Sequence, residues 1–117
     1  MTNPSLATMI HEAQRAEEDA RAVGMRDYAP DKWVTITSRL YALRRLASLC
    51  RRACGLARAG DSVVLVAPVG TSPDEVAGGL ADEGAGRERV EVLCPTAEEW
   101  PAAYAAARQR AGVEVVS

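Results

Sequence analysis

The residues best suited to chemistry lie in two short segments, each at the end of an apolar run. The first is Gly70-Thr71-Ser72, and the second contains Cys94 and Thr96. In parallel sheets ligands sit at the carboxyl ends of strands, and the N-terminus of a following helix suits a bound anion. These five residues therefore form a candidate ligand edge for a small-ligand or enzyme site.

The residues that follow these segments disfavour a phosphate. Ser72-x-x-Glu75 and Thr96-x-x-Glu99 both match the capping box, in which side chains occupy the helix N–H groups themselves. Asp74 and Glu98 add further negative charge beside them. The glycine patterns of phosphate-binding and dinucleotide-binding loops are missing from the sequence. We therefore predict no nucleotide or other cofactor.

The thiols and the single imidazole do not form a recognisable site in the sequence. Cys94 precedes a helix that could lower its pKa, but His11 lies 83 positions away. Cys50 and Cys54 share the apolar side of a predicted helix, and their spacing with His11 matches no zinc pattern. We predict structural cysteines and no metal.

A basic segment, residues 32–58, carries seven Lys and Arg residues and no acidic one. Helical spacing places its central arginines on the side opposite to its apolar residues, with an aromatic ring beside them. These candidate partner-binding or nucleic-acid-binding residues are Tyr41, Arg44, Arg45, Arg51 and Arg52. Because the flanking segments are acidic, the same arginines could also be neutralised within the chain. The pI near 5.4 disfavours a dedicated nucleic-acid binder.

The first half of the chain predicts two antiparallel helices. Asn3-Pro4 suits a helix start and Gly24 a helix end, so the first helix should span about residues 4–23. The second should span 32–58, with Asp31 as N-cap and Gly60 after its end. The β-branched stretch 33–37 allows a short strand instead, and Gly55 could end the helix earlier. Its apolar arc is about 200° wide, which predicts neighbours on two sides. Glu17 falls within the apolar stripe of the first helix and should meet an arginine of the second.

The second half changes to a strand and helix alternation. Residues 62–67 form a run that is continuously apolar after Ser62, whereas 89–94 and 113–116 are mixed, and helical segments at 73–83 and 97–111 separate them. This βαβαβ pattern predicts parallel strands, with the apolar run in the middle of the sheet. Spatial order 2-1-3 follows, with 3-2-1 as the alternative.

These observations predict an α/β protein of topology ααβαβαβ, in which a helical hairpin packs on a small three-stranded parallel sheet. We expect one domain over residues 1–117, with the hairpin in 1–60 and the sheet unit in 61–117. The N-terminus has no signal-peptide pattern and no run of apolar residues is long enough to span a membrane, so we expect a soluble, cytoplasmic protein without membrane contact.

Our leading functional hypothesis is a non-catalytic protein-binding module, acting as a regulator, adaptor or inhibitor. It would recognise an acidic partner through Arg–carboxylate contacts and would also self-associate as a homodimer. Nucleic-acid binding by the arginine face is the alternative, and a site at the candidate ligand edge is the second alternative.

Overall fold

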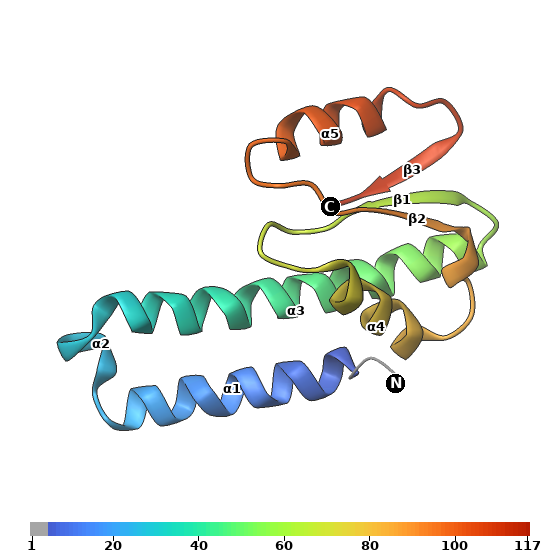
Figure 1. The fold of residues 1–117 in the computed structure, drawn as a ribbon. Helices are drawn as coiled ribbons and strands as arrows, with labels where there is room; N and C mark the ends of the chain where they lie inside the picture. Colours follow the sequence, from blue (N-terminus) through green and yellow to red (C-terminus); the bar gives the residue numbers. More distant parts are fainter. Residues whose placement is uncertain (1–4) are drawn as a thin grey trace.

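The computed structural model describes residues 5–117 and has the predicted α/β architecture (Figure 1). A long helical hairpin projects to one side of a small parallel sheet, and helices cover both faces of that sheet. Its elements are α1 (Leu6–Ala22), α2 (Met25–Tyr28), α3 (Pro30–Arg58), β1 (Ser62–Val66), α4 (Pro73–Glu83), η1 (Arg87–Arg89), β2 (Val90–Leu93), α5 (Trp100–Arg108) and β3 (Val113–Val116).

Helix α1 runs antiparallel to α3, as the short connector predicts (Figure 1). The predicted start at Asn3-Pro4 lies outside the described residues. The N-cap is Ser5, whose hydroxyl accepts a hydrogen bond from the Ala7 N–H at 3.2 Å. Gly24 follows the helix end with φ of 70°, a conformation that favours glycine. The connector itself contains the short helix α2.

Helix α3 begins two residues earlier than expected, and the prediction of Asp31 as its N-cap is wrong. Pro30 occupies the first helical position, where its missing N–H costs nothing, and Asp31 follows in the first turn. Residues 33–37 are helical, so the strand alternative is excluded. At the other end, the N–H groups of Gly60 and Asp61 donate to the carbonyls of Ala57 and Leu56, which closes the helix as predicted.

The sheet has order β2-β1-β3 and all its strands are parallel, which confirms the predicted order. Val63 of β1 lies opposite Val90 of β2 and Glu114 of β3. Residues 63–66 are buried, because helices cover β1 on both faces. Strands β2 and β3 form the two edges of the sheet, and both are less buried than β1.

The two faces of the sheet are covered unequally. Val63 and Leu65 of β1 pack into a large core with α1, α3 and α4. Val64 and Val66 face the opposite way, onto the single helix α5. Helix α5 is shorter than the predicted 97–111, because residues 97–99 form a turn before it and the turn at Gly112 leads directly into β3.

The wide apolar arc of α3 is covered within the chain, by α1 on one side and by α4 and the sheet on the other. Close packing here depends on Gly79 of α4. A Cβ atom at this position would lie 2.8 Å from Cys50 Sγ and 2.8 Å from Leu6 Cδ2. The arc therefore needs no external partner, and any binding surface must lie elsewhere on α3.

Candidate functional site

An apolar cleft of about 790 Å³ opens at the carboxyl ends of the strands. It lies between the middle of α3, the β1–α4 loop and the start of α5, where α3 extends past the sheet (Figure 1). Binding sites of small domains commonly have this size and this position in parallel sheets. The residues that line it are Thr37, Ser38, Tyr41, Ala42, Arg45, Val66, Pro68, Val69, Trp100 and Ser117.

The cleft combines an apolar wall with one positive charge at its rim. Tyr41 and Val69 are 70 % and 50 % exposed, which is high for large apolar side chains. The Arg45 guanidinium donates to the backbone oxygen of Ser117 at 2.9 Å and remains exposed. The lining residues contribute hydroxyls, aromatic rings and a guanidinium, which can hydrogen-bond to and stack on a bound group.

Trp100 is fixed in the cleft wall by its own contacts. Its indole Nε1 donates to the Ala67 carbonyl at 3.0 Å, at the end of β1. Its ring stacks on Tyr104, with centroids 5.1 Å apart and an interplanar angle of 17°. A ring held at both its edge and its face is a rigid surface for a ligand.

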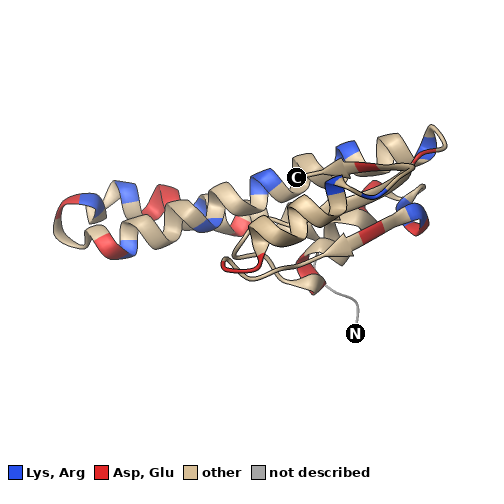
Figure 2. Cartoon of the chain, turned by 90° about the horizontal axis from the view of Figure 1, so that it is seen from above, with Lys and Arg blue, Asp and Glu red and all other residues tan. Residues whose placement is uncertain are grey.

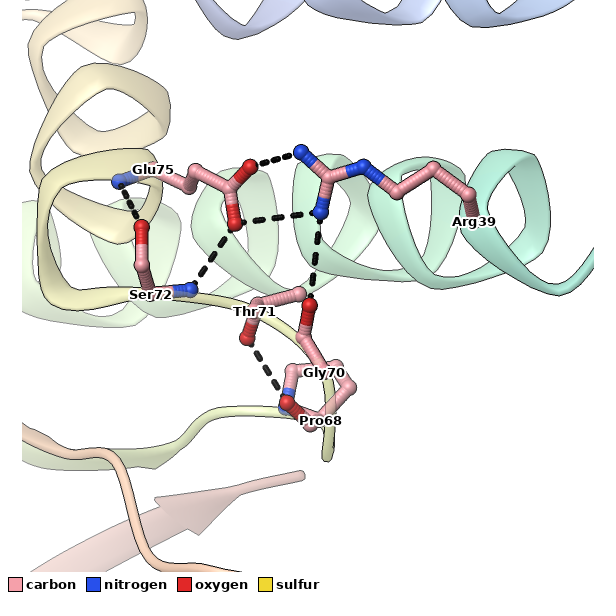
Figure 3. A network of polar contacts seen from close by, with 6 residues as sticks. All are labelled: Arg39, Pro68, Gly70, Thr71, Ser72 and Glu75. Atoms are coloured by element: carbon pink, nitrogen blue, oxygen red, sulfur yellow. Dashed lines mark hydrogen bonds and ion pairs between the residues drawn. The ribbon is translucent and has the colours of Figure 1, made fainter. Parts of the chain in front are cut away.

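The candidate ligand edge lies beside the cleft but does not line it. Thr71 Oγ1 donates to the Pro68 carbonyl at 2.7 Å, and Gly70 has φ of 90° in the same turn. Figure 3 shows that the Gly70 carbonyl also accepts from Arg39, which pairs with Glu75. The Gly70 carbonyl and the Thr71 hydroxyl, which were candidates to bind a ligand, thus form hydrogen bonds within the chain.

Glu75 closes this network and forms the predicted capping box. Its carboxylate accepts from the Ser72 N–H at 2.8 Å, and the Ser72 hydroxyl accepts from the Glu75 N–H at 3.2 Å (Figure 3). The hydrogen bond from Arg39, with a smaller contribution from Ser72, holds the pKa of Glu75 below its usual value despite partial burial. The carboxylate therefore stabilises the fold only while it is ionised.

This pKa predicts the pH dependence of a single substitution. A lowered folded pKa means that the stabilisation is present above the unfolded pKa and is lost as pH falls through the folded value. We expect Glu75→Gln to lower the free energy of unfolding by about 1 kcal/mol at pH 7, the size of a lost cap. Urea titrations at neutral and acidic pH measure this, and an equal loss at both would contradict the ionic contribution.

The second half of the candidate ligand edge is also internally bonded. Thr96 and Glu99 exchange the two hydrogen bonds of the predicted capping box, with the Thr96 N–H donating to Glu99 at 3.0 Å, but these bonds lie in the turn before α5, whose N-cap is Glu99. Cys94 is half-buried, and this burial raises the pKa of its thiol. Burial also raises the pKa of Cys50, to about 12. The thiols are thus protonated at neutral pH, which is the opposite of an activated nucleophile.

The predicted arginine face is an exposed stripe of α3. Arg51 pairs with Glu83 of α4 at 3.8 Å, and Arg45 reaches only a backbone oxygen. Within residues 5–117, Arg44 and Arg52 have no side-chain hydrogen bond or ion pair. Figure 2 shows that basic and acidic residues are interspersed along the projecting hairpin. The face is therefore only partly neutralised by the chain's own carboxylates.

The prediction that Glu17 meets an arginine of the second helix is wrong. Glu17 is 8 % exposed and pairs with Arg21 of its own helix. The i, i+4 spacing already places Arg21 beside it on the same face. Arg44 borders the same shallow hollow between α1 and α3 without bonding to Glu17.

Structure joins residues that sequence reasoning kept apart. Tyr41 and Arg45 are predicted candidates on α3, and the structure adds Trp100 of α5 to them. The contribution of Pro68 and Val69 was missed, because the distance between α3 and the β1–α4 loop is set by tertiary packing. In the sequence, the aliphatic Val69 directly before Gly70, a residue type common in turns, is a weak signal of this loop.

Two features are absent from residues 5–117. No group of three or more His, Cys, Asp or Glu side chains gathers in a way that could hold a metal ion. No helix in this range is both long and apolar enough to cross a bilayer.

Comparison with known proteins gives no family assignment for this chain. No protein-family model, curated protein or solved structure matches it.

Proposed function

We propose that this chain is a non-catalytic protein-binding module, a regulator, adaptor or inhibitor, that holds an acidic segment of another protein in the cleft. The observation that carries the proposal is the pairing of an exposed apolar rim, Tyr41 and Val69, with the exposed guanidinium of Arg45, which pairs with no Asp or Glu among residues 5–117. An enclosed small ligand would leave that rim exposed to water. A protein segment would cover it, and two of the three residues, Tyr41 and Arg45, are of types enriched at binding hot spots.

Charge gives the expected chemistry of the partner. No acidic residue lines the cleft, and the neighbouring arginines Arg44 and Arg52 have no carboxylate partner within the described chain. Guanidinium groups bind carboxylates through paired hydrogen bonds, so Asp or Glu beside an apolar side chain fits this surface. The positive charges of Arg44 and Arg52 would steer such a partner towards the cleft.

A selection from displayed random peptides tests the proposal. We expect enrichment of peptides that combine an aromatic or aliphatic residue with Asp or Glu. Their affinity should fall at least about tenfold in Tyr41→Ala and in Arg45→Glu, as expected for hot-spot residues. Tyr28→Ala and Arg26→Glu are matched controls, because both side chains are exposed at the far tip of the hairpin. The proposal fails if no peptide is enriched, or if the cleft variants bind the enriched peptides as well as wild type does.

Nucleic-acid binding is the second candidate, favoured by the exposed stripe of Arg44, Arg45, Arg51 and Arg52 beside Tyr41. It predicts affinity for labelled duplex DNA or single-stranded RNA that falls linearly in a log–log plot against salt. Fluorescence anisotropy at low and near-physiological salt distinguishes the candidates. Tight binding that Arg44→Glu with Arg51→Glu abolishes would replace the protein-binding proposal.

A further inference from the structure

The solvent side of α3 carries a heptad stripe that the chain itself leaves uncovered. Its members follow alternating steps of three and four residues, the spacing of a coiled-coil seam. Every one of them is exposed, and two are large and apolar: Val34 at 58 % and Tyr41 at 70 %. The stripe consists of Asp31, Val34, Ser38, Tyr41, Arg45, Ser48 and Arg52.

We infer that the part of this stripe from Asp31 to Arg45 binds the same residues of a second copy of the chain, with the two α3 helices antiparallel. The inference rests on the proposed function, since it assigns one protein partner to the α3 side of that surface. A two-fold axis makes such an interface self-complementary, so that each residue is used twice.

Charge along the stripe determines the orientation. Asp31 lies at one end, and Arg45 and Arg52 lie towards the other, with the apolar residues Val34 and Tyr41 between. A parallel pair would set Asp31 against Asp31 and Arg45 against Arg45. An antiparallel pair instead places Asp31 of each copy alongside Arg45 of the other. Neither Asp31 nor Arg45 has an ion-pair partner within residues 5–117.

The position of the axis follows from the spacing. Ser38 is midway between Asp31 and Arg45, so the two Ser38 residues would meet at the axis. Val34 of each copy would then pack beside Tyr41 of the other, which covers both exposed side chains. The small Ser38 side chain allows the helices to approach closely at the centre.

The same geometry links self-association to the cleft. Ser38, Tyr41 and Arg45 belong both to the stripe and to the cleft lining, whereas Asp31 and Val34 belong only to the stripe. The second copy therefore covers the cleft mouth, and an acidic partner must displace it. Peptide binding should weaken as protein concentration rises.

A charge exchange measured by sedimentation equilibrium tests the inference. We expect Asp31→Lys and Arg45→Glu each to weaken dimerisation at least about tenfold, since each opposes like charges. The double variant should restore the affinity to within about threefold of wild type, because the pair is re-formed with its signs exchanged. Asp74→Lys is the matched control: it makes the same change in the first turn of α4, away from the stripe.

Cross-linking tests the orientation. In a Cys94→Ser background, where the remaining Cys50 and Cys54 are buried, Ser38→Cys should cross-link to a dimer with a short bismaleimide. Ser48→Cys should not, because its counterpart lies beyond the paired region. Equal cross-linking of both variants would overturn the antiparallel arrangement.

The outcomes separate this inference from the proposed function. Wild type that sediments as a monomer at all concentrations, or a double variant that fails to recover, overturns the inference. Peptide binding retained by Asp31→Lys would leave the proposed function standing in either case. A wild type that dimerises as described, with no peptide enriched in the selection, would overturn the proposed function alone.

Discussion

Replacing Leu46 by alanine is expected to lower the free energy of unfolding by about 3 to 4 kcal/mol, the usual cost of a large cavity in a closed core. Leu46 has no exposed surface and belongs to the cluster that joins α3 to α1, α4 and the sheet. Few neighbours can move into the space, because Leu43 and Val63 in the same cluster are themselves fully buried. Urea denaturation followed by far-ultraviolet circular dichroism measures the loss.

Two comparison variants make the Leu46 result interpretable. Leu46→Met conserves volume and should cost less than about 1.5 kcal/mol. Val34→Ala removes an exposed side chain of the same helix and should change stability by at most about 0.5 kcal/mol in the monomer. A Leu46→Ala loss below the Leu46→Met loss would mean that α3 does not form the core described here.

Replacing Trp100 by alanine should cost about 3 kcal/mol, near the lower limit for a buried Trp because this ring is only partly enclosed. The second face of the sheet depends on α5 alone, where Trp100 and Tyr104 cover Val64 and Val66. The substitution also removes the hydrogen bond to the Ala67 carbonyl. Urea denaturation monitored by the remaining Trp33 fluorescence measures it.

Trp100→Phe separates the two contributions of that side chain. It keeps an aromatic ring against Tyr104 but lacks the indole N–H, so we expect a loss of about 1 kcal/mol, the net value of one hydrogen bond. Equal losses for Trp100→Ala and Trp100→Phe would show that ring packing contributes nothing. Stability unchanged in both would contradict the packing of α5 on the sheet.

Periodicity predicted most of the architecture because each element repeats its apolar residues with its own period. The apolar run 62–67 indicated a central strand, and the alternating runs indicated edges, which led to order 2-1-3. Glycine positions also predicted the helix ends at Gly24 and Gly60. These features are local in sequence, so a single chain is enough to detect them.

Boundaries and side-chain partners were less predictable, for reasons that particular residues illustrate. Asp31 is a good N-cap by type, but Pro30 is a better first helical residue and it displaces the cap. Arg21 and Arg44 both border the hollow beside Glu17, and Arg21, four residues along the same helix, forms the pair. The choice of N-cap and the choice of ion-pair partner each depend on competition between residues that sequence patterns do not distinguish.

The cleft could not be predicted from the sequence, because it is formed by segments that are far apart along the chain. Tyr41 and Arg45 were identified from charge and aromatic content, but Trp100 lies far along the chain and Val69 gave little signal. The position of α5 over the sheet brings them together, and this follows from the crossover connection rather than from any motif. The prediction of a ligand edge at Gly70–Ser72, Cys94 and Thr96 stays untested, although several of its polar groups form hydrogen bonds within the chain.

The central claim is that the cleft binds an acidic protein segment, and amide chemical-shift mapping tests it most directly. Isotope-labelled protein would be titrated with a peptide enriched in the selection. We expect the largest shifts at Tyr41, Arg45 and Val69 and at the indole N–H of Trp100, with Tyr28 and Arg26 unchanged. Shifts that instead cluster at Thr71, Ser72 and Thr96, or along Arg51 and Arg52 alone, would contradict the proposal and move the binding site to the strand edge or the arginine stripe.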